Sequence, residues 1–418
     1  MKKRFVPVVL VSFGLVAAAC GGDDSSTATT GATTAETTAE TAAPTTEGGA
    51  ETTAAPTECA LEAPLKIGFA ADLGELGAFS DQPGSEAAKV MVDKINAAGG
   101  VGGQQIEYVV KDIQGDPAAT QRAAQELLDD GVNAIIGPPF ASTGAPLLDT
   151  VNGAAPIIFM ASTDPALADT ARGAFLASFS DPVQSAAIAE FALGKGFTKA
   201  VTLSSTDDVY FSGNPEYFTT VFTDGGGAVL GDYAFSLADS DFSTQVNEIA
   251  GLADKPEVLF TAMVMPQTQV LLEQLEAAGL GDIVVMGPDA FDATVVWSAG
   301  AVADGVVFAA HTFPSADNGV QAFLDEAAAA GAKIETISFG ALAADAVQLI
   351  VAAAAQACST DGATLITTLD GLENVQVTTG TVSYKGRNGV PDKDVAIVTV
   401  EGGAPVLVET MRPTNVPA

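Results

Sequence analysis

The chain has 418 residues, which is too long for one ordinary hydrophobic core and favours two lobes that enclose a cleft. It contains 52 Asp and Glu residues against 17 Lys and Arg, so its formal net charge is −35 at pH 7. A surface this acidic argues against a nucleic acid or an anionic membrane face as partner, because both would repel it.

The first 20 residues have the features of an export signal. Three basic residues (2–4) precede an apolar run over 5–19, which is too short to span a membrane in the mature protein. The run ends in Ala-Ala-Ala-Cys20, which resembles the lipobox of bacterial lipoproteins, whose cysteine becomes the lipid-bearing N-terminus. We therefore predict a lipoprotein signal peptide over 1–20 with lipidation at Cys20. The alternative is a plain signal with an incidental cysteine.

Residues 21–58 form a low-complexity segment dominated by Thr, Ala, Glu and Gly. The segment has no aromatic and no large aliphatic residue, so it cannot bury a core. We predict a disordered tether that lets the folded part stand away from the membrane surface.

Two cysteines remain after the tether, Cys59 and Cys358. An even number of cysteines in an exported chain favours a disulfide, which would tie the start of the folded part to a helix predicted over 339–357. Sequence spacing does not show whether the two sulfur atoms meet, so the bond stays open at this point.

From residue 65 onward, predicted strands and helices alternate. Helices are indicated by apolar residues at helical spacing, and strands by short apolar runs. The predicted helices are 85–98, 118–130, 183–195, 243–253 and 339–357, and the predicted strands are 65–70, 105–111, 133–136, 156–159, 200–204, 228–235, 258–262, 283–286 and 305–310. This alternation predicts an α/β fold whose parallel sheets are covered on both faces and bind ligands at the carboxyl ends of their strands.

Two neighbouring apolar runs end in the same pattern. Ser142-Thr143 follows the first run and Ser162-Thr163 follows the second, and each pair precedes a predicted helix start. If the two strands are parallel, both hydroxyl pairs and both helix N-termini meet at one sheet edge. These neutral donors suit a small anion such as a carboxylate. The alternative is that the hydroxyls only cap their helices.

Five short motifs resemble the leucine/isoleucine/valine-binding family, the type I periplasmic binding proteins of ABC transporters. Each motif is weak alone, but their order and spacing are specific. They are KINAAGGVGG at 94–103, KDIQGDP at 111–117, GVNAIIGP at 131–138, Asp241-Phe242 ahead of a helix, and MGPD at 286–289. The resemblance covers roughly residues 65–409.

The resemblance implies two Rossmann-like lobes with parallel sheets, joined by three crossing strands and closing on a ligand. We place the crossings near 178–182, 309–315 and 378–383. Lobe one would then comprise 65–180 and 315–377, and lobe two 181–314 and 378–418.

The resemblance also assigns ligand-binding residues. The carboxylate of an amino acid would bind Ser142, Ser162 and Thr163, with Ala141 as the alternative to Ser142. Asp289, after the Gly-Pro pair, would hold the ammonium group, or it would only cap the segment that follows.

The ligand side chain would lie against an aromatic wall. Phe79 and Tyr210 match the family's aromatic positions. Met263 or Met265 takes the place of a second tyrosine, which leaves the ligand side chain open. Ordinary core packing is the alternative for these methionines.

Other chemistries find little support. The one histidine, His311, lies on a predicted crossing with no nucleophile elbow in the sequence, so we expect a structural role for it. Zinc-ligand spacings are absent, and Asp239-Ser240-Asp241 lacks the rest of a calcium loop. We expect no catalytic residue, no metal and no cofactor.

Taken together, the sequence predicts a solute-binding lipoprotein on the outer face of the cytoplasmic membrane. It would bind an amino acid, branched-chain or related, and deliver it to the permease subunits of an ABC importer. Its partners would be this small-molecule ligand, the permease and, through the N-terminal lipid, the membrane. The alternatives are a ligand-sensing lipoprotein that serves a signalling partner, and a hydrolase on the same fold.

Overall fold

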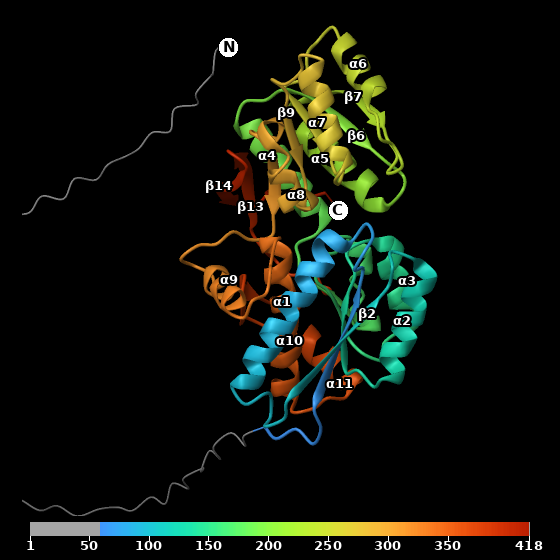
Figure 1. Cartoon of the computed structure of the whole chain (residues 1–418), viewed down its shortest axis with the longest axis vertical. Helices are drawn as coiled ribbons and strands as arrows, with labels where there is room; N and C mark the ends of the chain where they lie inside the picture. Colours follow the sequence, from blue (N-terminus) through green and yellow to red (C-terminus); the bar gives the residue numbers. More distant parts are fainter. Residues whose placement is uncertain (1–58, 418) are drawn as a thin grey trace, which may run out of the picture. The chain divides into compact units, whose positions relative to one another are not determined.

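The computed structural model describes residues 59–417 and contains two separate β-sheets flanked by helices (Figure 1). The predicted signal peptide, Cys20 and the tether lie outside the described residues. The mixed α/β architecture with parallel sheets confirms the predicted fold class. We call the five-stranded sheet and its helices lobe one, and the seven-stranded sheet and its helices lobe two.

The sheet of lobe one is entirely parallel, with strand order β2-β1-β3-β4-β5. Its strands are β1 (Leu65–Ala71), β2 (Ile106–Asp112), β3 (Ala134–Gly137), β4 (Ile157–Phe159) and β5 (Ala174–Leu176). Its principal helices are α1 (Ala78–Ala97), α2 (Pro117–Asp129), α3 (Ala141–Val151), α9 (Val320–Ala329), α10 (Ile337–Ala357) and α11 (Gly362–Asp370). Because both faces are covered, the inner strands β3 and β4 and the strand β5 are apolar throughout rather than alternating.

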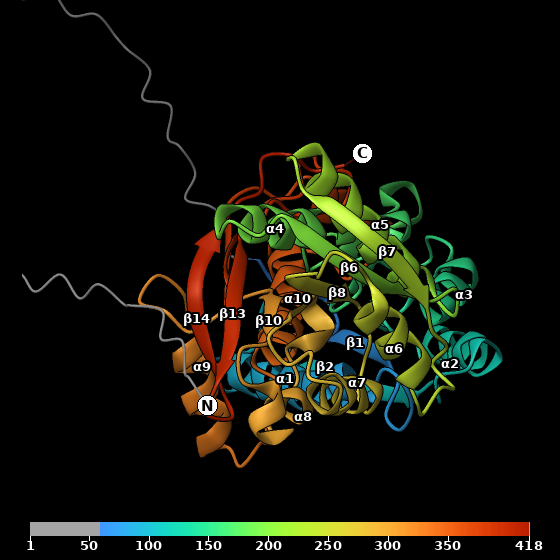
Figure 2. The same ribbon diagram turned by 90° about the horizontal axis from the view of Figure 1, so that it is seen from above.

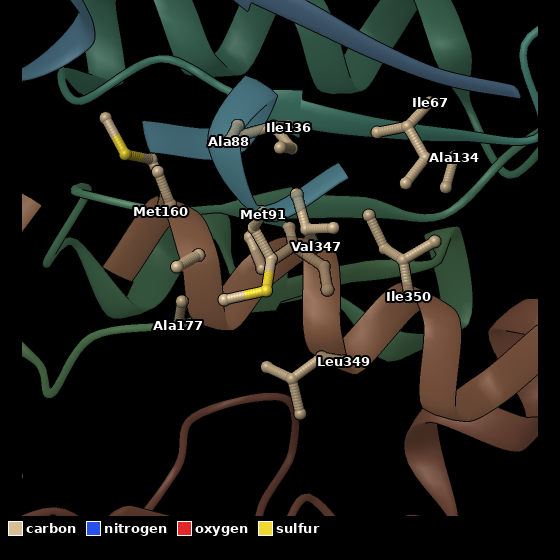
Figure 3. Packing of buried hydrophobic residues seen from close by; sticks show 14 of the residues in the cluster. Ile67, Ala88, Met91, Ala134, Ile136, Met160, Ala177, Val347, Leu349 and Ile350 are labelled. Carbon is tan, nitrogen blue, oxygen red and sulfur yellow. The ribbon is translucent and has the colours of Figure 1, made fainter. Parts of the chain in front are cut away.

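Helices α1 and α10 cover one face of this sheet, and α2 and α3 cover the other. Figure 3 shows the first of these layers, where Met91 of α1 and Val347 and Ile350 of α10 pack near Ile67 and Ile136 of the strands. The helix α10 is long and apolar enough to cross a bilayer, but 78% of its most apolar window is buried inside the protein, as in a core helix.

The sheet of lobe two has seven strands in the order β14-β13-β10-β9-β8-β6-β7. Five strands are parallel, and β13 and β14 run antiparallel at one edge (Figure 2). The strands are β6 (Lys199–Ser204), β7 (Ala228–Ala234), β8 (Val258–Thr261), β9 (Val284–Gly287), β10 (Val307–Ala310), β13 (Val395–Glu401) and β14 (Ala404–Met411). The α-helices are α4 (Asp181–Gly194), α5 (Val209–Asp224), α6 (Ser243–Gly251), α7 (Gln267–Ala277) and α8 (Thr294–Trp297). A small hairpin, β11 (Val375–Val377) with β12 (Gly380–Val382), completes the strands of residues 59–417.

The membership of the hydrophobic clusters indicates where the chain passes between the lobes. Ala177 packs in the core of lobe one and Phe179 in that of lobe two, close to the first predicted crossing. Tyr384 still packs in lobe one, where its hydroxyl donates to the carbonyl of Leu176, whereas Val395 packs in lobe two. We therefore propose that the third crossing lies at 391–394, later in the chain than 378–383.

Two sequence-based helices differ from the structure. The helix predicted over 85–98 begins earlier, because α1 starts at Ala78. The segment after Thr163 contains only a short 3-10 helix, η1 (Pro165–Leu167), where the sequence predicts a helix start like that of α3. Asp164 caps η1 by accepting from the N–H of Ala166, and Asp169 caps a second short turn directly after it. Such local aspartate bonds compete with continued helix, so only one of the two hydroxyl pairs lies at the start of an α-helix.

Cys59 and Cys358 form a disulfide with their Cα atoms 5.3 Å apart. The bond joins the segment before β1 to the residue that ends α10. It therefore fixes the start of the described chain to the core helix of lobe one.

Candidate functional site

A small cavity lies between the lobes, next to the carboxyl ends of their strands, and we call it the inner cavity. Four of the predicted binding residues, Phe79, Thr163, Tyr210 and Asp289, line it together with Pro139, Phe140, Ala161, Ala290 and Phe339. The space that could hold the centre of a water molecule is about 10 Å³, which suits about one water molecule. An amino acid therefore needs a movement of side chains or lobes to enter.

Asp289 is the charged group of this cavity. It follows β9, begins the short helix η3 (Asp289–Phe291), and is 3% exposed. One carboxylate oxygen accepts from the Tyr210 hydroxyl at 2.8 Å, and the other lies 2.9 Å from Nε2 of His311. Its backbone N–H donates to the side-chain oxygen of Gln184 at 2.9 Å. A carboxylate has about four acceptor positions, so capacity remains for a donor from a ligand.

His311 positions Asp289 without supplying a positive charge. Burial lowers the pKa of His311 below its usual value, although the carboxylate of Asp289 acts in the opposite direction. The neutral ring donates from Nε2 to Asp289 and packs on Phe179 with ring centroids 4.0 Å apart. Within residues 59–417, the Nδ1 atom of His311 has no hydrogen-bond partner. We therefore propose that the structural role of His311 is to hold the carboxylate of Asp289 in place.

Tyr210 joins the aromatic wall to Asp289. Its hydroxyl donates to Asp289 and accepts from the N–H of Ala290 at 3.0 Å, while its ring meets Phe140 edge to face, with centroids 5.8 Å apart. Burial raises the pKa of Tyr210 well above its ordinary value, so the hydroxyl keeps its proton.

Thr163 lies in the cavity wall, but its hydroxyl already has a partner. It donates to Asp181 at 2.6 Å, and the same oxygen of Asp181 accepts from Gln184 and Asn214. Burial, more than any other factor, raises the pKa of Asp181 to about 7. Thr163 would have to exchange this bond in order to donate to a ligand carboxylate.

Ser162 and Ser142 lie outside the lining of the inner cavity. The Ser162 hydroxyl is buried and has no partner among the described residues, so it remains a free donor. The Ser142 side chain is exposed, and its backbone N–H donates across the lobes to Asp208 at 3.0 Å. The N-terminus of α3 therefore already holds a carboxylate of the protein itself.

Sequence reasoning did not single out Phe140, Phe339, Asp181 and Asp208. Phe140 directly precedes the hydroxyl pair at 142–143, and Asp208 precedes Tyr210, so their proximity to predicted residues was a usable signal. Phe339 comes from α10, far along the chain, and no sequence pattern connects it with the cavity.

Several buried aspartates lie close together around the inner cavity. Asp292, which is buried close to Asp289, has its pKa raised to about 7, above all by burial. The charge of Asp289 also disfavours ionisation of both Asp181 and Asp292. Among the described residues, no group of three or more His, Cys, Asp or Glu side chains is arranged to hold a metal ion.

Two α/β lobes with an acidic and aromatic site between their strand ends are the arrangement found in solute-binding proteins that close on a small molecule. The sequence profile described as "Periplasmic binding protein" matches residues 64–404. The chain belongs to this family, with the type I architecture.

Individual relatives agree with this assignment. The Leu/Ile/Val-binding protein BraC3 of Rhizobium johnstonii is 25% identical over 356 residues, which cover 83% of this chain and 94% of the relative. The crystal structure of the leucine-binding protein LivK from Thermotoga maritima has a TM-score of 0.77 at 22% identity, covering 84% of this chain and 99% of LivK. A solute-binding protein from R. palustris in complex with benzoate has a TM-score of 0.74 at 21% identity, covering 85% and 98%.

Proposed function

We propose that this protein binds an amino acid between its lobes and delivers it to the permease of an ABC importer. The observation that carries the proposal is the environment of Asp289, whose partners are the neutral groups Tyr210 and His311. Within residues 59–417 no Lys or Arg side chain is paired with Asp289. A buried carboxylate without a counter-ion favours a ligand that brings a cation.

The same environment favours one of the two ligand classes named for the similar proteins. BraC3 is named as a binder of leucine, isoleucine and valine, whereas the R. palustris protein holds benzoate. A simple carboxylate would be repelled by Asp289, and a poorly hydrated cleft screens that repulsion weakly. An amino acid avoids this cost, because its ammonium group can face Asp289 while its carboxylate faces lobe one.

For the carboxylate we propose neutral donors of lobe one. The free hydroxyl of Ser162 is the first candidate. Thr163 and the backbone N–H of Ser142 contribute after exchanging their present partners, Asp181 and Asp208.

A binding screen tests the ligand class. Each of the common amino acids and its deaminated acid is added to the purified protein, and thermal unfolding is measured. A ligand at 100 times its dissociation constant adds about 2.7 kcal/mol of stability. Stabilisation by amino acids but not by deaminated acids or benzoate is expected. Stabilisation by benzoate alone would contradict the proposal.

We propose that the ligand enters the small inner cavity when the lobes open and is enclosed when they close again. A ligand that touches both lobes only in the closed state shifts the equilibrium towards closure. Small-angle scattering should show a smaller radius of gyration at saturating ligand. No change would argue against closure as the binding mechanism.

We further propose that Cys20 carries the lipid that anchors the protein at the membrane. In cells, Cys20→Ser should move the protein from the membrane fraction to the soluble fraction and abolish labelling with a radioactive fatty acid. Labelling that persists in Cys20→Ser would disprove lipidation at this residue.

A further inference from the structure

A second, much larger cavity adjoins the inner cavity, and we call it the outer cavity. It offers about 490 Å³, against about 10 Å³ for the inner cavity. The two share Phe79 and Ala290 in their linings. A ligand whose ammonium group is held at Asp289 can therefore extend its side chain into the outer cavity.

The walls of the outer cavity are mainly apolar. They include Leu76 and Phe79 from lobe one and Val264, Met265, Ala293 and Ala299 from lobe two. The polar members are Glu75 and Ser298, both exposed, and Gln269, which is half-buried. Apolar walls with polar groups near solvent suit an apolar side chain that enters from the cleft.

Phe79 borders both cavities. It is the second residue of α1, so the helix holds its backbone, and its carbonyl accepts from the Thr336 hydroxyl. The half-buried ring meets Phe339 edge to face, with centroids 5.4 Å apart, and lies 6.4 Å from Phe140. The ring therefore forms part of the wall of both cavities.

We propose that the outer cavity receives the ligand side chain and selects amino acids with a large apolar side chain, with phenylalanine preferred over valine and leucine. This inference rests on the proposed function. A dry cavity of about 150 Å³ is enough for benzene, so the four carbons of leucine would leave most of this space unfilled. The Phe79 ring and the Met265 sulfur offer favourable contacts to an aromatic group.

The two alanines are the residues that create the space. Ala293 is 3% exposed and Ala299 is half-buried, and both face the outer cavity. Each methylene of the ligand that this cavity buries should tighten binding about fourfold. The selection therefore depends on these two small side chains as much as on the large ones.

The test is a calorimetric titration of the full chain with alanine, valine, leucine, methionine and phenylalanine. The affinity should rise along this series, and phenylalanine should bind at least tenfold more tightly than valine. Valine or leucine binding as tightly as phenylalanine would overturn the inference while leaving the proposed function intact. Binding of none of the five, with a deaminated acid or benzoate binding instead, would overturn both.

A variant that fills the outer cavity tests whether the volume of this cavity, rather than another feature, causes the selectivity. Ala299→Leu should weaken phenylalanine binding at least tenfold and change valine binding by less than about threefold. Ala278→Leu, at an exposed alanine of α7's end, is the matched control and should change neither. Ala293→Leu repeats the test at a more buried position of the same cavity. A melting curve for each variant identifies any that fails to fold. An equal loss for both ligands in Ala299→Leu would contradict the inference.

Discussion

Two buried aspartates, Asp289 and Asp345, show how the same residue type takes different roles near the lobe junction. Asp345 of α10 accepts from the ammonium of Lys393 at 3.1 Å and from the N–H of Thr379 at 3.0 Å. Lys393 also donates to the carbonyl of Ala177 at 2.8 Å. The cation for Asp345 is thus supplied by the chain, next to the proposed third crossing.

Asp289 is equally buried, but its side-chain partners in the described structure are a phenol and a neutral imidazole. Burial raises the pKa of Asp345 despite the opposing charge of Lys393, which shows how strongly burial disfavours the charged form at that site. The comparison teaches that a buried carboxylate whose cation belongs to the chain stabilises the fold. A carboxylate held only by neutral groups is available for a cationic ligand.

The largest effect is expected from removing the cation that pairs with Asp345. This change leaves Asp345, like Asp289, without a Lys or Arg partner among residues 59–417. Lys393→Met leaves Asp345 buried without its cation, and breaking such a pair typically costs about 3–5 kcal/mol of unfolding free energy. Urea denaturation of both proteins measures the loss. The double variant Lys393→Met/Asp345→Asn should recover most of it. A loss below about 1 kcal/mol in the single variant would show that the pair contributes little.

The reverse change removes the charge from Asp289. Asp289→Asn should weaken amino-acid binding about 30-fold or more, because losing one member of a buried charge pair costs about 2–5 kcal/mol. The fold should survive, since the new amide is the same size and keeps one oxygen that can accept from His311. Calorimetry with an amino acid and its deaminated acid provides the control. Equal affinities for both ligands in both proteins would refute the ammonium role.

A third buried carboxylate, Asp181, extends the comparison, because its protonation makes the stability of the fold depend on pH. Its folded pKa of about 7 lies above its unfolded value, so the folded state binds the extra proton between about pH 4 and pH 7. Its contribution to stability is therefore present at low pH and is lost as the pH rises through this window, by at most about 1.4 kcal/mol per pH unit.

Asp181→Asn imitates the protonated form, because one oxygen of Asp181 accepts all three side-chain hydrogen bonds and an amide retains that oxygen. Relative to this variant, the wild type should lose about 1–3 kcal/mol of unfolding free energy between pH 5 and pH 8. Denaturation curves at both pH values measure the difference. A wild type that gains stability on the variant as the pH rises would contradict the raised pKa.

The smallest effect concerns a carboxylate satisfied by backbone groups. Asp208 accepts from the N–H of Ser142 in the opposite lobe and from the N–H of Tyr210 in its own. Asp208→Ala removes the interlobe bond, at a cost of about 0.5–1.5 kcal/mol to the closed state. Scattering should then show a more open ligand-free protein. Ligand affinity should change by less than about tenfold, because the lost interlobe bond is offset by the release of the Ser142 N–H for the ligand. Unchanged scattering would mean that this bond does not hold the lobes together.

The sequence by itself determined the fold class, because the spacing of apolar residues is a local property that distinguishes strand from helix. The strand-end pattern pointed to Thr163, because the carboxyl ends of parallel strands converge at one sheet edge. The family resemblance implied Phe79, Tyr210 and Asp289, and all four residues line the inner cavity. Thr163 follows β4 and Asp289 follows β9, whereas Phe79 and Tyr210 lie in the first turns of α1 and α5. Local rules failed after Thr163, where the caps of Asp164 and Asp169 replaced a helix by short turns.

Only the tertiary structure decided which of these residues meet. The Tyr210 hydroxyl bonds to Asp289, 79 residues along the chain, and no sequence spacing predicts that contact. The same holds for Asp208, which reaches Ser142 across the lobes. The volume of the outer cavity depends on how α1 packs against segments of lobe two. Side-chain selection is therefore a property of packing between distant segments, which pairwise sequence signals do not contain.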